Sequence, residues 1–196
     1  MRAFIRLWVL LLLPLWLSAC GVNDIPTYDE QTTAAWAQVE NQYQRRADLI
    51  PNLVETVKGF AAQERETLTA VVEARARVGQ MQIPKDLLTD PEAFRRFQQN
   101  QDTLTQALSR LMVVVERYPQ LRSSENFLTL QAQLEGTENR LAVARRDYIE
   151  AVRLFNTELR TLPGRFWHSL LYSDLQPKQT FAAADGTSTV PQVKFQ

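Results

Sequence analysis

Apolar side chains recur every seven residues along most of the chain, in two series that lie three residues apart. Between residues 28 and about 80 these series are Trp36, Tyr43, Ile50, Val57, Glu64, Val71 and Val78, and Val39, Arg46, Leu53, Phe60, Thr67, Ala74 and Met81. The spacing places the apolar positions on one face of a helix, as in a coiled coil. It predicts a helix over residues 28–80. Because the register continues past Pro51, we expect a bend near residues 46–50; two stacked helices are the alternative.

The same pattern predicts two more long helices. In the second, over residues 91–118, Asp90 is a candidate N-cap before Pro91 and Gln101 is the only polar residue on the apolar face. In the third, over residues 125–162, apolar side chains recur every seven positions, and Pro163-Gly164 ends the pattern. Residues 165–172 predict a short fourth helix. Residues 173–196 show no periodicity and predict a disordered tail.

These segments define an all-α fold class, an elongated antiparallel up-and-down helical bundle of three long helices and a short C-terminal helix. At 1.5 Å per residue the long helices span about 80, 42 and 58 Å. The first is longer than its partners. Its excess length therefore protrudes, folds back at Pro51 or contacts another molecule, and a homo-oligomer is one such outcome.

The first twenty residues have the order of regions of a secretory signal. Arg2 and Arg6 precede an apolar run over residues 7–17, and Ser18 and Ala19 precede Cys20, the only cysteine in the chain. A helix that spans a bilayer needs about 20 apolar residues, whereas thirteen separate Arg6 from Cys20. We therefore divide the chain into a signal peptide (residues 1–19), a lipidated tether (20–27), a helical domain (28–172) and a tail (173–196).

Leu17-Ser18-Ala19-Cys20 resembles the lipobox of bacterial lipoproteins. The resemblance implies cleavage between Ala19 and Cys20, diacylglycerol on the Cys20 thiol and a fatty acid on the new amino terminus. An uncleaved anchor and an ordinary secreted protein with a free thiol are the alternatives. Gly21, which is not aspartate, favours the outer membrane by the lipoprotein sorting pattern; the cytoplasmic membrane is the alternative. The expected location is the bacterial cell envelope, facing the periplasm.

Charge and composition exclude several function classes. The chain has 22 basic and 22 acidic side chains, and without Arg2 and Arg6 the remainder is slightly acidic, so nothing indicates a nucleic-acid partner. A single cysteine allows no disulfide within the chain. The only histidine, His168, lies outside the long helices. Neither a Ser-His nor a Cys-His pair nor a Glu-x-x-His metal site is therefore expected, and we predict no enzyme, no metal and no cofactor besides the lipid on Cys20.

Several segments resemble the LemA family. They are Trp36 to Val39 (WAQV), Arg45 to Phe60 (RRADLIPNLVETVKGF), Glu116 to Leu121 (ERYPQL) and Leu134 to Arg140 (LEGTENR). The resemblance covers roughly residues 30–165 and implies an envelope-associated helical bundle without an established enzymatic activity. Such proteins usually have a membrane-spanning amino-terminal segment, where this chain has a lipobox. Candidate interaction residues within the motifs are Trp36, Arg45, Arg46, Asp48, Pro51, Asn52, Glu135, Glu138 and Asn139.

Polar residues on the apolar faces need partners. We expect Arg46, Glu64, Arg75 and Glu138 to pair across helices; a polar groove that grips a partner peptide or an envelope polymer is the alternative. Asn52, Asn126 and Asn139 are expected to form hydrogen bonds between helices. The leading hypothesis is a lipid-anchored, non-enzymatic scaffold that contacts membrane lipid through Cys20 and an unidentified envelope protein. The alternative is a small-ligand or lipid carrier with an aromatic pocket at Phe166, Trp167 and Tyr172.

Overall fold

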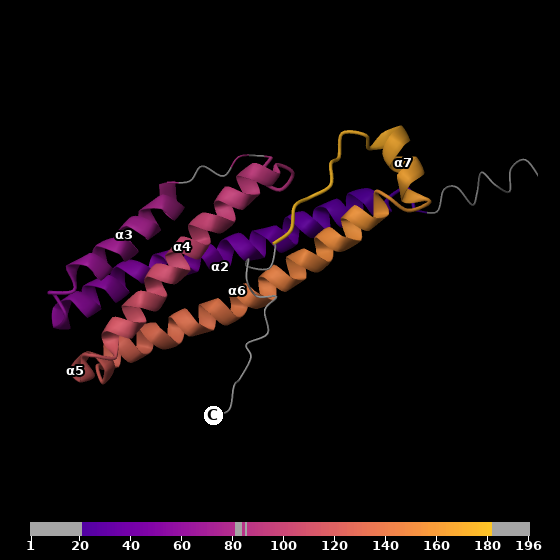
Figure 1. Ribbon diagram of the computed structural model, residues 1–196. Coiled ribbons are helices and arrows are strands. Elements are labelled where there is room, and N and C mark those ends of the chain that lie inside the picture. Colours follow the sequence, from indigo (N-terminus) through magenta and orange to yellow (C-terminus); the bar gives the residue numbers. More distant parts are fainter. Residues whose placement is uncertain (1–20, 81–83, 85, 182–196) are drawn as a thin grey trace, which may run out of the picture.

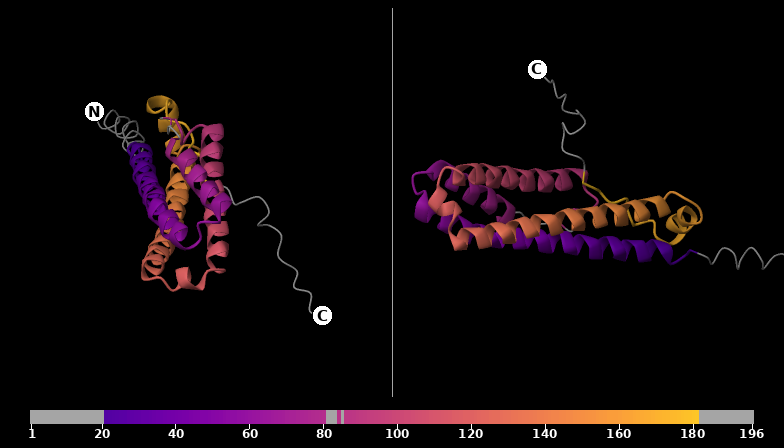
Figure 2. Two further views of the ribbon diagram at one scale, coloured as in Figure 1. Left: turned by 90° about the vertical axis from the view of Figure 1, so that its left-hand side faces the viewer. Right: turned by 90° about the horizontal axis from the view of Figure 1, so that it is seen from below.

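The computed structural model describes residues 21–80, 84 and 86–181. It contains α2 (Asp24–Phe60), α3 (Arg65–Gln80), α4 (Pro91–Val115), α5 (Pro119–Arg122), α6 (Glu125–Glu158) and α7 (Gly164–Leu171). The all-α prediction is confirmed, because every regular element in this part of the chain is a helix. Helices α2, α3, α4 and α6 alternate in direction, so the bundle is up-and-down (Figures 1 and 2).

The two longest helices, α2 and α6, pack side by side and antiparallel along most of their length (Figure 2). Helix α2 has 37 residues and therefore spans about 55 Å. Helices α3 and α4 pack mainly on each other and cover the half of this pair that ends at α5. The opposite half has α7 at its end (Figure 1). The bundle is thus elongated and its two ends differ.

The core consists of the apolar series identified in the sequence. On α6 the buried residues are Phe127, Leu134, Leu141, Tyr148 and Phe155. On α4 they include Phe94, Phe97, Leu104, Leu108, Leu111 and Val115, and on α2 they include Trp36, Val39, Tyr43, Ile50, Leu53 and Val57. Heptad spacing therefore identified the buried face of each long helix correctly, since residues three and four apart share a face.

The predicted continuous helix over residues 28–80 is wrong, because this segment forms two helices. Helix α2 continues through Pro51 to Phe60, and the chain reverses direction over residues 61–64 before α3 begins. Ala61 closes α2 by donating its N–H to the Val57 carbonyl at 2.9 Å, and its side chain is buried at the turn. The excess length of the first segment therefore folds back, but beyond Phe60 rather than at Pro51.

Helix α2 accommodates Pro51 with help from α3. Proline has no N–H, so the carbonyl four residues earlier, that of Ala47, loses its helical donor. The Arg75 Nε of α3 donates to this carbonyl oxygen at 3.0 Å. The hydrogen bond that proline removes within α2 is thus replaced by one between helices, which joins α3 to α2 at the site of the lost bond.

Part of the predicted disordered tail is ordered, so the boundary at residue 173 is wrong. Asn156 on α6 donates to the Lys178 carbonyl and accepts from the Lys178 N–H, both at 2.9 Å. Lys178 Nζ lies 2.6 Å from Asp29 Oδ1 on α2, and Phe181 is buried in the core. Residues 173–181, which we call the strap, therefore fasten the end of α7 to the bundle. Residues 182–196 lie outside the described residues.

Helix α7 crosses the end of α6 at very short range. A Cβ on Gly164 would lie 2.2 Å from the Glu158 carbonyl oxygen, so only glycine fits there. The same crossing buries Glu158 Oε1 without a hydrogen-bond partner among the described residues. This burial, together with the negative charge of Asp24, raises the pKa of the Glu158 carboxyl.

The hydrogen bond between Arg75 and Ala47 predicts a coupling with Pro51. Arg75→Met leaves a polar carbonyl without its donor and should lower the free energy of unfolding by about 1 kcal/mol or more. In a Pro51→Ala background the N–H of residue 51 can again donate to the Ala47 carbonyl. Arg75→Met should then lower the free energy of unfolding much less. Urea unfolding of the four proteins of this double-mutant cycle measures the coupling; equal costs in both backgrounds would contradict it.

The raised pKa of Glu158 predicts that this residue destabilises the fold as the pH rises. The folded state holds the proton of Glu158 more tightly than the unfolded chain does. The free energy of unfolding therefore falls as the pH rises from the unfolded pKa to the higher folded pKa. Glu158→Gln removes this loss. The thermal midpoint of the variant should exceed that of the parent chain at about pH 7 and approach it at about pH 4. A constant difference over this range would show that Glu158 does not titrate abnormally.

Candidate functional site

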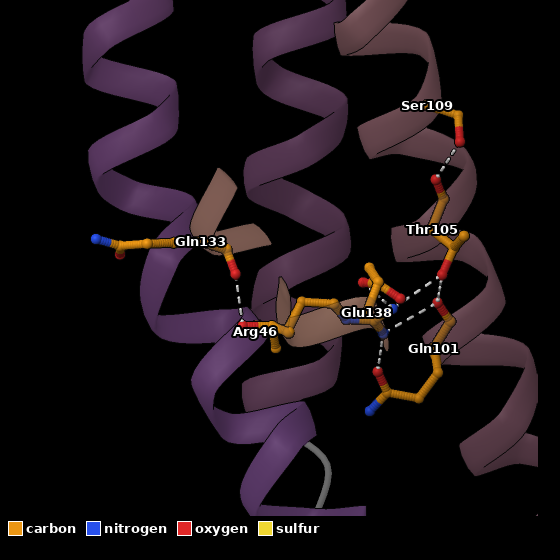
Figure 3. A network of polar contacts seen from close by, with 7 residues as sticks. Arg46, Gln101, Thr105, Ser109, Gln133 and Glu138 are labelled. Atoms are coloured by element: carbon orange, nitrogen blue, oxygen red, sulfur yellow. Dashed lines mark hydrogen bonds and ion pairs between the residues drawn. The ribbon is translucent and has the colours of Figure 1, made fainter. Parts of the chain in front are cut away.

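A buried arginine in the middle of α2 contacts both α4 and α6. Arg46 is 2% exposed. One guanidinium nitrogen donates to Thr105 Oγ1 at 3.0 Å and to Glu138 Oε1 at 3.2 Å, and the other donates to the side-chain oxygen of Gln101. Figure 3 shows these side chains converging from three helices. Arg46 is therefore the polar link between the α2–α6 pair and α4.

Burial of a charge is costly unless the charge is paired and hydrogen-bonded. Arg46 meets this condition with one carboxylate, one amide and one hydroxyl, and its guanidinium lies 5.1 Å from the ring centroid of Tyr43. Its Nε remains without a partner among the described residues. Glu138, in contrast, is 41% exposed and reaches water. The pair is therefore asymmetric, because only the arginine depends on its partners for solvation.

An open groove lies beside this network, between α4 and α6, with a volume of about 860 Å³. Its buried apolar residues are Leu108, Val115, Phe127 and Leu134. Its remaining lining residues are Thr105, Ser109, Met112, Glu116, Arg122, Leu128, Gln131, Glu135, Glu138 and Asn139. Apolar residues flanked by polar groups are typical of a surface that accepts a ligand or a protein segment.

The charges at the groove are already partnered. Glu116 Oε2 lies 3.1 Å from an Arg122 guanidinium nitrogen, and Gln131 donates to Glu135 Oε1 at 2.8 Å. Glu138 is held by Arg46. Exposed pairs of this kind contribute little stability, but they fix carboxylates at the edge of an apolar surface. The groove therefore offers apolar contact together with acceptors for hydrogen bonds.

An aromatic cluster fills the bundle beyond Arg46, toward α7. Trp36 lies 5.2 Å from Tyr148 and 5.4 Å from Phe97, measured between ring centroids. Phe181 of the strap completes the cluster, with its ring 5.2 Å from that of Phe94. Tyr148 donates its hydroxyl to the Gln179 carbonyl at 2.8 Å, and burial raises the Tyr148 pKa. The cluster is thus a packed core that holds the strap in place.

The structure brings together some of the predicted site residues and separates others. Arg46 pairs with Glu138 as expected, and Glu135 and Asn139 line the adjacent groove. Trp36 is a core residue. The exposed candidates on α2 lie elsewhere, and these are Arg45, Asp48, Pro51 and Asn52.

Two expectations about polar side chains are wrong in detail. Asn52, Asn126 and Asn139 are exposed and are not buried donors between helices, because each lies off the apolar face of its helix. Glu64 does pair across elements, but in the turn before α3 and not on a helix seam. It accepts from the Tyr118 hydroxyl at 2.8 Å and lies 3.1 Å from Arg117.

Sequence reasoning missed the roles of two polar residues, Gln101 and Lys178, and named Arg75 without its partner. Gln101 was identified only as a polar interruption of an apolar face, yet it is a partner of Arg46. Arg75 bonds a backbone carbonyl, and Lys178 contacts Thr32 and Asp29 from the strap. Gln101 had a usable signal, because a polar side chain on a buried face needs a partner. Arg75 and Lys178 depend on chain reversals that the heptad pattern does not encode.

The predicted lipid attachment cannot be placed in the fold, because Ala19 and Cys20 lie outside the described residues. Within residues 21–80, 84 and 86–181, no helix is both long enough and apolar enough to cross a bilayer. The same part of the chain has no group of three or more histidine, cysteine, aspartate or glutamate side chains placed to bind a metal ion.

The fold and the groove define a class of protein: an elongated helical bundle with a lateral groove beside a buried ion pair. The sequence matches the model of the LemA family over residues 35–195, and the chain belongs to that family. It is also similar to the magnetosome proteins MamQ 2 and MamQ 1 of Paramagnetospirillum magneticum. Each is 28% identical over 160 residues, which cover 74% of this chain and 59% of the relative. The chain thus spans less than two thirds of the length of these relatives.

The asymmetry of the ion pair predicts the order of two substitutions. Glu138→Ala leaves a buried guanidinium without its counter-charge and should cost about 2 kcal/mol or more. Arg46→Met leaves Glu138 free to reach water but takes a hydrogen bond from the buried Gln101 amide, so it should cost about 1 kcal/mol, less than Glu138→Ala. Chemical denaturation of both variants checks the order, and a larger cost for Arg46→Met would contradict it.

Proposed function

We propose that the chain is a lipid-anchored, non-enzymatic scaffold of the bacterial cell envelope that binds a segment of another envelope protein in the groove between α4 and α6. The groove is the observation that carries this proposal. It combines accessible apolar side chains, the half-exposed Leu128 and the partly buried Met112, with carboxylates at its edge, as do surfaces that accept an amphipathic protein segment. Helices hold it on both sides, so its shape is established before a partner arrives.

The amino terminus supports the envelope location. The order of a basic start, an apolar run and the sequence LSAC before Gly21 favours lipidation of Cys20 and transfer to the outer membrane; retention at the cytoplasmic membrane is the alternative. Two or more acyl chains hold a protein stably on a bilayer, whereas one chain gives only marginal binding. The lipid would thus fix the location, and the bundle would provide the contacts.

The carrier hypothesis has less support. It places an aromatic pocket at Phe166, Trp167 and Tyr172. Trp167 and Tyr172 instead pack on the buried residues Ile25, Phe155 and Leu159, and Phe166 is exposed. Trp167 and Tyr172 thus cover the end of the core, and the open depression beside Phe166 is lined by neither of them.

Site-specific photo-crosslinking tests the groove. Leu128 at the groove and Val72 on α3 are each 50% exposed, so they form a matched pair for a benzoylphenylalanine probe. We expect one discrete crosslinked protein in cells from position 128 and none from position 72. Filling the groove with Ser109→Tyr should reduce the yield of the product crosslinked from position 128 about tenfold, which corresponds to a loss of about 1.4 kcal/mol of binding free energy. Equal crosslinking at the two positions, or a yield unaffected by Ser109→Tyr, would contradict the proposal.

Replacement of the lipidated residue tests the anchor separately. Cys20→Ser removes the thiol that the lipid requires, so the chain should no longer be matured and should lose its acyl mass. Mass spectrometry of the amino-terminal peptide from membranes provides the measurement, with Ser18→Ala as a control that retains a small residue before the cysteine. A Cys20→Ser chain that is still cleaved and still bound to membranes would disprove lipid anchoring.

A further inference from the structure

Exposed apolar side chains are concentrated at the α7 end of the bundle. Leu162, Phe166, Leu170 and Leu171 are 80%, 51%, 62% and 55% exposed. They account for four of the ten large apolar residues that are exposed in the described part of the chain, although they lie within ten consecutive positions. Single exposed apolar residues are ordinary, but a group of them marks an interaction surface.

The orientation of α7 fixes which of its faces is exposed. Trp167 packs on the core residues Ile25, Phe155 and Leu159, and Gly164 lies against the Glu158 carbonyl. Phe166 and Leu170 are four residues apart in α7, so they lie on a common side of this helix. Leu162 precedes α7 and lines the same depression as Phe166. The inner face of α7 therefore packs on the core of the bundle. Its outer face carries apolar side chains that are exposed.

This surface lies at the end of the bundle where α2 begins, a few residues after the apolar amino-terminal segment in the sequence. A Cβ on Gly21 would lie 3.0 Å from Pro163 Cγ, so the first described residue touches the segment that leads into α7. Figure 1 shows α7 beside the beginning of α2 and far from α5. An anchor at residues 1–20, whether a lipid on Cys20 or an uncleaved apolar segment, therefore brings a bilayer to this end.

The charges beside the apolar surface suit a phospholipid headgroup region. Arg160 and Arg165 are exposed and line a shallow depression together with Leu162 and Phe166. The acidic groups at this end include Asp24, Asp29, Glu30, Glu158 and Asp174; Asp29 pairs with Lys178, and an oxygen of Glu158 is buried. Two guanidinium groups next to the apolar residues match anionic lipid phosphates.

We propose that the outer face of α7 is a membrane-docking surface. Leu162, Phe166 and Leu170 enter the boundary between headgroups and acyl chains, and Arg160 and Arg165 bind lipid phosphates. This inference rests on the proposed amino-terminal anchor, because an eight-residue helix presents too little apolar area to hold the protein alone. Docking restrains the bundle at a second point, and α5 and the adjacent groove then project away from the bilayer.

Spin-label depth measurements on the full lipidated chain in vesicles test the proposal. A nitroxide at Leu170→Cys reports on the α7 surface, and one at Val113→Cys, which is 70% exposed on α4 near α5, is the control. In phosphatidylcholine vesicles that contain phosphatidylglycerol, the label at 170 should be more accessible to oxygen and less accessible to an aqueous nickel chelate than the label at 113. Arg160→Gln combined with Arg165→Gln should remove the part of this difference that depends on phosphatidylglycerol.

Flotation of the same vesicles separates this inference from the anchor. Protein that floats with vesicles while position 170 stays as accessible to the chelate as position 113 would overturn α7 docking and leave the anchor intact. Protein that fails to float would overturn both. Dipolar broadening at position 170, without enrichment in oxygen, would show contact between two copies of the chain and would also overturn docking on lipid.

Discussion

The rest of the structure depends on the solvation of one buried guanidinium. Arg46 lies on the apolar face of α2, and among the described residues Gln101 and Thr105 on α4 and Glu138 on α6 replace the water that it loses. These partners are reached in one relative position of the three helices. A purely apolar seam tolerates sliding, whereas a buried polar contact has a single satisfied register. We therefore infer that Arg46 fixes the register of the three helices more than it stabilises them, as buried polar groups do in other helical assemblies.

The heptad pattern predicted the buried face of every long helix, because burial follows the 3.6-residue period whatever the partner is. It also marked Arg46 and Glu138 as polar residues that should pair across helices, without assigning their partners. It did not locate the chain reversal after Phe60, because the apolar register continues from α2 into α3. The strap was missed because it is held by side-chain bonds to its backbone, such as those of Asn156 with Lys178, which carry no periodic signal.

The two ends of the bundle serve different purposes in this account. At the α7 end, the start of α2, the exposed apolar residues and two arginines lie near one another, and the proposed docking places them on a bilayer. At the α5 end, the groove between α4 and α6 lies farthest from that surface and is open from the side. Membership of the LemA family agrees with a membrane-associated helical protein.

The central claim is that the Arg46 network holds α4 at a fixed distance from α6 and so keeps the groove preformed. Double electron–electron resonance between nitroxides at Ser109→Cys on α4 and Gln131→Cys on α6 measures that distance across the groove. The account predicts one narrow distance distribution in the parent chain and a broadened or shifted one after Arg46→Met, in a protein that remains folded. An unchanged narrow distribution in the Arg46→Met protein would contradict it.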